Sequence, residues 1–104
     1  MIKFFKNLLG ASSKRNIAEL MKKGATIVDV RTEREFKSGH VNGSVNIPLD
    51  SLSKSISKLK KDKPVITCCA SGMRSSAAKG ILLNHGFAEV YNGGSWISVQ
   101  QKLE

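Results

Sequence analysis

The apolar positions of this chain follow two periods, one typical of buried strands and one of amphipathic helices. Short apolar, β-branched runs occupy residues 25–30 ("ATIVDV"), 64–69 ("PVITCC") and 88–92 ("AEVYN"). Such runs are typical of strands that are buried on both faces of a sheet. A fourth run at 43–49 ("GSVNIPL") reads as a shorter strand broken by its proline.

Helical periodicity fills the segments between these strands. Thr32 and Glu35 have the spacing of a capping box, which predicts a short helix beginning there. The other helices are expected at 16–24, 50–61, 74–86 and 95–103. Strands that alternate with helices predict an α/β domain with a parallel sheet covered on both faces. Ligand sites in such domains lie beyond the carboxyl ends of the strands.

Length and charge narrow the picture further. The 104 residues suit one domain, expected at 14–104, with a core large enough to need no disulfide. The net charge of +9 comes partly from the lysines of 54–63, yet no aromatic residues are interleaved with them. We therefore interpret this segment as a solvated helix face and expect no nucleic-acid partner. The charge still favours the approach of small anions.

The amino terminus, "MIKFFKNLLGASS", superficially resembles an export signal. Lys6 interrupts its apolar segment, and the remaining run is shorter than the roughly 7 to 15 apolar residues of such signals. We expect residues 1–13 to form a tail or a short amphipathic segment that packs Phe4, Phe5 and Leu8 loosely or lies on a membrane surface, without stable insertion. The expected location is the cytoplasm.

The only two cysteines, Cys68 and Cys69, are neighbours at the end of the 64–69 strand. Their Cα atoms are ~3.8 Å apart, too close for ordinary disulfide geometry. No histidine cluster completes a zinc site, so neither a metal nor a cofactor is expected. A reactive thiol in a reducing compartment fits best.

Strand alternation distinguishes the two thiols. Ile66 and Cys68 share one face of the strand, so Cys68 is expected to pack under helices. Cys69 is expected to be the first residue of the loop that leads into the next helix. The loop 69–74 can direct backbone N–H groups inward, and the helix amino terminus adds its positive field. A sulfur held there would have a pKa below the roughly 8.5 of a free thiol.

Three segments in order carry a resemblance to a known family. "IVDVRTEREFKSGHVNGSVNIP" (27–48), "CASGMRS" (69–75) and "NGGSWISVQQ" (92–101) resemble the signature segments of the rhodanese, or sulfurtransferase, family. The resemblance implies a small α/β domain with a mostly parallel sheet of about five strands and helices on both faces. It also implies transfer of sulfane sulfur from thiosulfate or a persulfide donor to cyanide, a thiol or a protein cysteine.

The resemblance assigns roles by position. Cys69 would carry the sulfur as a persulfide, with backbone amides of the loop stabilising its anion. A small anionic donor would be bound by the residues that follow it: Ala70, Ser71, Gly72, Met73, Arg74 and Ser75. Arg74 could instead brace the loop. We interpret Asp29, Arg31 and His40 as structural braces of the neighbouring loops.

Two alternatives remain open. Related phosphatases and arsenate reductases have five residues between cysteine and arginine, which is the spacing from Cys68 to Arg74. Counted from Cys69, the loop has the shorter sulfurtransferase length, and we favour that register. The protein could also act as a persulfide carrier for a partner protein, with a shallow and exposed site.

Overall fold

The computed structural model describes residues 13–104, which form nine helices and strands. In chain order these are α2 (Ser13–Lys22), β1 (Thr26–Asp29), α3 (Glu33–Lys37), β2 (Val45–Asn46), the 3₁₀ helix η1 (Leu49–Lys58), β3 (Val65–Cys69), α4 (Met73–Asn84), β4 (Val90–Ser95) and α5 (Trp96–Leu103). The expected packing of Phe4, Phe5 and Leu8 lies outside the described residues.

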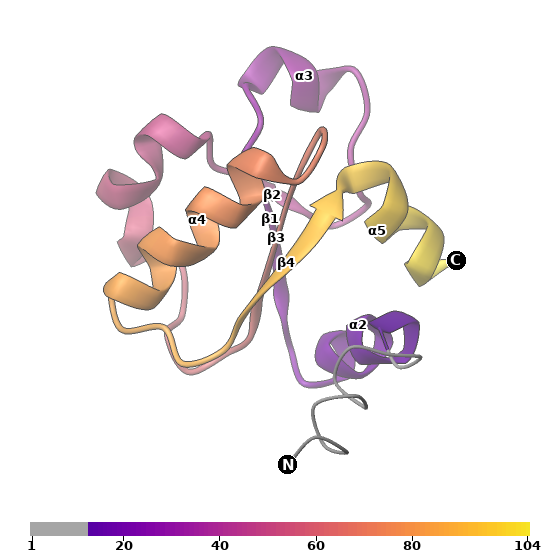
Figure 1. The fold of residues 1–104 in the computed structure, drawn as a ribbon, viewed down its shortest axis with the longest axis horizontal. Helices are drawn as coiled ribbons and strands as arrows, with labels where there is room; N and C mark the ends of the chain where they lie inside the picture. The colour runs from indigo at the N-terminus through magenta and orange to yellow at the C-terminus, as the bar shows by residue number, and fades with distance from the viewer. Residues whose placement is uncertain (1–12) are drawn as a thin grey trace.

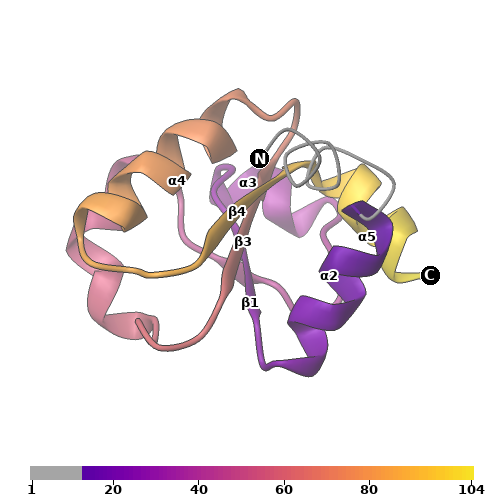
Figure 2. The ribbon, with the colours of Figure 1, turned by 60° about the horizontal axis from the view of Figure 1, so that its bottom comes forward.

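The strands form one parallel sheet in the order β2-β1-β3-β4. The described residues thus contain four strands where the family resemblance implied about five. Figure 1 shows the sheet between two helical layers, with α4 and η1 on one side and α2 and α5 on the other. Figure 2 shows the same division from a second direction. The predicted α/β architecture with helices on both faces is confirmed.

Each face of the sheet has its own hydrophobic core. Val65 contributes to the core under α4 and η1, whereas its neighbour Ile66 contributes to the core under α2 and α5. The same alternation sends Cys69 to the first core and Cys68 to the second. The two thiols therefore lie on opposite faces, as strand geometry predicts.

Three predicted helices differ in detail. The helix expected at 16–24 is α2, which runs from Ser13 to Lys22. The helix expected at 50–61 is a 3₁₀ helix from Leu49 to Lys58. Serine occupies every second position from 51 to 57, and serine side chains compete with the backbone bonds of a regular α-helix. The helix expected at 74–86 begins at Met73, with Gly72 as its N-cap.

A helix that crosses a bilayer needs about 20 consecutive, mostly apolar residues, and this sets the standard for the described helices. Within residues 13–104, none has both the length and the apolar character needed to cross a membrane.

Candidate active site

Cys69 lies where β3 ends and the loop to α4 begins. It is the last residue of β3 and pairs with Ser95 of β4, so the loop itself comprises only residues 70–72. The sequence prediction that Cys69 opens the loop is thus off by one residue. Because the loop has only three residues, the first turn of α4 lies against the Cys69 sulfur.

Hydrogen bonds from the loop and from α4 surround the Cys69 sulfur. The Gly72 N–H donates to Sγ at 2.9 Å, and the Ser75 N–H lies 3.4 Å from it. The Ser75 hydroxyl oxygen is 3.5 Å from Sγ. Burial by itself raises the pKa of the thiol, but the Ser75 side chain and the amides of Ser75, Gly72 and Ser71 lower it by more. The net pKa of Cys69 is lowered, which favours the thiolate.

Gly72 makes the shortest of these contacts possible. Its φ of 108° lies in the left-handed region, where an L side chain is strained. This conformation aims its amide back at the sulfur.

We expect Gly72→Ala to lower the free energy of unfolding by about 1–2 kcal/mol and to raise the thiol pKa. Urea unfolding and the pH dependence of alkylation measure the two effects. Gly43→Ala is a matched control, since Gly43 also has positive φ but lies outside this loop. A thiol pKa raised equally by both substitutions would contradict a specific role for the Gly72 amide.

The Cys69 side chain is fully buried, with 0% of its surface exposed. The expectation of a shallow, exposed site is therefore wrong for this conformation. The physical reason is the short loop, which folds the Gly72 amide directly over the sulfur. The Cys69 sulfur is therefore not in contact with solvent in this structure.

Some of the other residues predicted to contact the substrate are exposed to solvent, and one of them is buried. Ala70 and Ser71 are exposed at the tip of the loop, and the Met73 side chain is 80% exposed. Ser75 is fully buried, so it faces the sulfur and not the solvent. No side chain caps the start of α4, because its N-cap residue is Gly72.

Cys68 has a different environment. It is fully buried on the α2 and α5 side of the sheet and pairs with Asp29 of β1. Burial raises the pKa of its thiol to about 12, with a further increase from the charge of Asp29. At neutral pH Cys68 is a protonated thiol that faces away from the loop.

Arg74 is held by Glu35. Its two terminal nitrogens donate to the two carboxylate oxygens at 2.8 and 3.1 Å. This pairing, with help from the Thr32 amide, lowers the pKa of Glu35 to about 2. Glu35 also completes the predicted capping box with Thr32, so one carboxylate joins the start of α3 to the start of α4. Of the two roles expected for Arg74, this contact is the bracing one.

A surface hollow lies beside this pair. It is lined by Val30, Thr32, Pro48, Leu49, Asp50 and Arg74. The Arg74 side chain is about one third exposed. An anion that entered the hollow would find Arg74 as its nearest cation among these lining residues.

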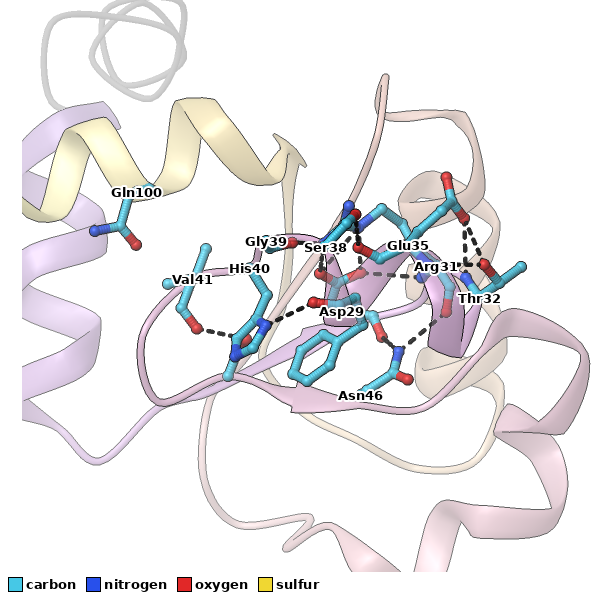
Figure 3. A network of polar contacts seen from close by, with 12 residues as sticks. Asp29, Arg31, Thr32, Glu35, Ser38, Gly39, His40, Val41, Asn46 and Gln100 are labelled. Atoms are coloured by element: carbon cyan, nitrogen blue, oxygen red, sulfur yellow. Dashed lines mark hydrogen bonds and ion pairs between the residues drawn. The ribbon is translucent and has the colours of Figure 1, made fainter.

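Asp29 and Arg31 form the expected ion pair at the end of β1. Arg31 donates from Nε and Nη2 to the carboxylate of Asp29, with the shortest contact at 2.7 Å. A further bond from Nη2 reaches the Gly39 carbonyl, and the guanidinium lies over the Trp96 ring. Asn46 of β2 donates to the carbonyls of Asp29 and Arg31. Figure 3 shows how these contacts join β1, β2 and the loop after α3.

His40 lies at the edge of the same network. Its Nδ1 is 2.7 Å from the Phe36 carbonyl oxygen, and its ring stacks on the Phe36 ring. Both contacts are local to the turn, which agrees with the bracing role. Within the described residues no cluster of three potential metal ligands is present.

Asn92 is the residue that sequence reasoning missed. Its Oδ1 accepts from the Ser75 hydroxyl at 2.6 Å and from the Gly94 amide at 2.9 Å, and its Nδ2 lies 3.3 Å from the Gly72 carbonyl. A register shift between β3 and β4 just beyond Asn92 accompanies this arrangement. The only available signal was its position before "GG" at the carboxyl end of a predicted strand.

Comparison with known proteins agrees with this geometry. Residues 13–96 match the model of the rhodanese-like domain family. The chain is 37% identical over 73 residues to the thiosulfate sulfurtransferase GlpE of Pseudomonas savastanoi pv. phaseolicola, covering 70% of this chain and 69% of that protein. It is 40% identical over 68 residues to the uncharacterized protein YqhL of Bacillus subtilis, covering 65% of this chain and only 54% of that protein.

Solved structures give the same result. The structure described as rhodanese with anions from E. coli superimposes with a TM-score of 0.68 at 32% identity, covering 71% of this chain and 89% of that one. The human single-domain sulfurtransferase TSTD1 superimposes with a TM-score of 0.74 at 22% identity, which supports the fold. The family match covers most of the chain and includes the Cys69 loop. This chain belongs to the rhodanese-like domain family.

Proposed function

We propose that this protein is a sulfurtransferase in which Cys69 carries sulfane sulfur as a persulfide. The observation that carries the proposal is the pair of backbone N–H donors to the Cys69 sulfur, from Gly72 and Ser75, with the Ser75 hydroxyl oxygen 3.5 Å from the same sulfur. Such donors stabilise a thiolate, and a thiolate is the form that attacks a sulfur donor. GlpE proteins, to which the chain is similar, are described as thiosulfate sulfurtransferases.

The proposed reaction has two steps, sulfur uptake from the donor and sulfur release to the acceptor. The Cys69 thiolate attacks the outer sulfur of thiosulfate. A bond forms between Cys69 Sγ and that outer sulfur, and the sulfur–sulfur bond of thiosulfate breaks. Sulfite leaves with the electron pair of that bond. A nucleophilic acceptor, such as cyanide or a thiolate, then attacks the outer sulfur of the persulfide and restores the Cys69 thiolate. The amides that bind the thiolate are also close to the charge that the persulfide carries.

Cys69 is a better candidate nucleophile than Cys68 for two reasons. The Cys69 sulfur accepts from the loop amides, whereas Cys68 lies on the other face of the sheet in the core under α2 and α5. The thiol pKa is lowered for Cys69 and raised to about 12 for Cys68. This favours the shorter loop of the sulfurtransferases over the phosphatase register that starts at Cys68.

Intact-mass spectrometry tests the proposal. Wild-type protein incubated with thiosulfate should gain the mass of one sulfur atom, and cyanide should remove that mass with formation of thiocyanate. The same result in the Cys68→Ser variant would assign the added atom to Cys69. Protein that takes up no sulfur from thiosulfate or from a small persulfide would contradict the proposal.

Glu35 is expected to limit how well Arg74 binds an anionic donor. Glu35→Gln removes the charge that holds the guanidinium but retains a residue able to complete a capping box. We expect the KM for thiosulfate to fall about two- to fivefold, with less than about 1 kcal/mol change in stability. Initial rates of thiocyanate formation measure the change, with Arg74→Ala as the opposing control. A higher KM in Glu35→Gln would show that Arg74 acts as a brace.

A carrier function for a partner protein has one observation in its favour. Met73, directly after the loop, is 80% exposed, and methionine is common at adaptable protein-binding surfaces. Rapid sulfur exchange with a protein persulfide, together with slow turnover of thiosulfate, would support the carrier. Rapid turnover of thiosulfate and cyanide alone would argue against it.

A further inference from the structure

Asn92 is an exposed residue beside the loop, and its hydrogen bonds fix the orientation of its side chain. The Gly94 N–H can only donate, so the Asn92 atom 2.9 Å from it must be the oxygen Oδ1. The amide nitrogen Nδ2 then faces the Gly72 carbonyl at 3.3 Å. Asn92 therefore offers an acceptor to Ser75 and a donor to the loop.

The Ser75 hydroxyl has one proton and three neighbours that could accept it. Asn92 Oδ1 is at 2.6 Å, the Gly72 carbonyl at 3.1 Å and the Cys69 sulfur at 3.5 Å. In the thiol form, the S–H can donate to the Ser75 oxygen while Ser75 donates to Asn92. In the thiolate form, the sulfur has no proton and gains from the hydroxyl proton itself.

The two forms of Cys69 thus require different orientations of one hydroxyl group. Asn92 Oδ1 loses little when Ser75 turns away, because it keeps the Gly94 amide. The position of Ser75 is itself fixed, since the Thr67 hydroxyl donates to its carbonyl at 2.9 Å. The hydroxyl can therefore rotate without movement of the backbone.

We propose that Asn92 is a positioning residue for Cys69, competing with its sulfur for the Ser75 hydroxyl proton while tethering the loop at Gly72. The inference rests on the proposed function, because it concerns the thiolate that attacks the donor. A neutral amide competes weakly, so the hydroxyl can turn to the sulfur. A carboxylate in the same place would accept the Ser75 hydroxyl proton more strongly, so that the hydroxyl would not turn to the sulfur. It would also lack the N–H donor to the Gly72 carbonyl.

Other charged groups also act on this sulfur. Arg74 of α4 interacts with it through charge, and Glu35 of α3 neutralises Arg74. Asp29 of β1 is paired with Arg31, and Cys68 is uncharged. Each of these acts through space, and none is hydrogen-bonded to the Cys69 sulfur within residues 13–104. Asn92 differs because its effect passes through Ser75.

Asn92→Asp tests the inference in the Cys68→Ser background, where Cys69 is the only thiol. The alkylation rate with iodoacetamide at pH 7 should fall about fivefold, whereas the rate at high pH should be unchanged. Asn42→Asp adds the same charge on an exposed loop and should leave both rates unchanged. The melting temperature is measured in parallel, since a purely structural role would change it without changing the pH profile.

A double-mutant cycle separates an effect of Asn92 that passes through the Ser75 hydroxyl from a direct effect of the added charge. In a Ser75→Ala background the effect of Asn92→Asp should shrink to less than twofold. An unchanged pH profile in Asn92→Asp, or a full effect that persists without the Ser75 hydroxyl, would overturn the inference. The alkylation rates report only the state of the Cys69 thiol and do not depend on sulfur transfer. If the wild type took up no sulfur, the proposed function would be contradicted, but the role of Asn92 could still be tested.

Discussion

Replacement of Cys69 by serine is expected to abolish sulfur uptake from thiosulfate and to reduce thiocyanate formation by more than about a thousandfold. The hydroxyl of serine is not ionised near neutrality, so the amide of Gly72 and the first turn of α4 would surround a group that cannot attack sulfur. Intact mass and initial rates measure the two losses. The substitution is nearly isosteric, so its stability should stay close to that of the wild type.

Cys68→Ser is the matched control for this experiment. Cys68 is the adjacent residue with the same chemistry, but its side chain lies on the opposite face of β3. It should retain most of the sulfur uptake. If Cys68→Ser were the inactive variant and Cys69→Ser the active one, the register of the loop would be wrong and the phosphatase or arsenate reading would gain support.

Asp29→Asn is expected to lower the free energy of unfolding by about 3 kcal/mol. The substitution retains the shape of the side chain but leaves the Arg31 charge without its carboxylate, and both residues are buried. Breaking a buried ion pair by removing one partner costs about 3–5 kcal/mol. Urea unfolding measures the change.

The control for this effect is Asp62→Asn, since Asp62 is an exposed residue of a turn. It should change the stability by less than about 0.5 kcal/mol. An Asp29→Asn protein as stable as the control would show that the Gly39 carbonyl and the Trp96 ring are enough to hold Arg31.

Local signals in the sequence were sufficient for most of the fold. Apolar runs located the strands, and alternation placed Cys68 and Cys69 on opposite faces of β3, because the period of a strand is fixed by its geometry. The capping box of Thr32 and Glu35 is present as predicted.

The errors concern contacts between segments that are distant in sequence. The pairing of Glu35 with Arg74 joins two helices, and the contact of Asn92 with Ser75 joins β4 to α4. No periodicity reports such contacts, because each depends on how two elements are packed. The burial of Cys69 was missed for the same reason, since it depends on how tightly the loop folds back over the end of β3.

The central claim is that inward-facing amides keep the Cys69 sulfur ionised, and the pH dependence of its alkylation tests that claim most directly. In the Cys68→Ser variant, the account predicts a half-maximal rate at a pH below the value of about 8.5 for free cysteine. A midpoint at or above that value would contradict the account.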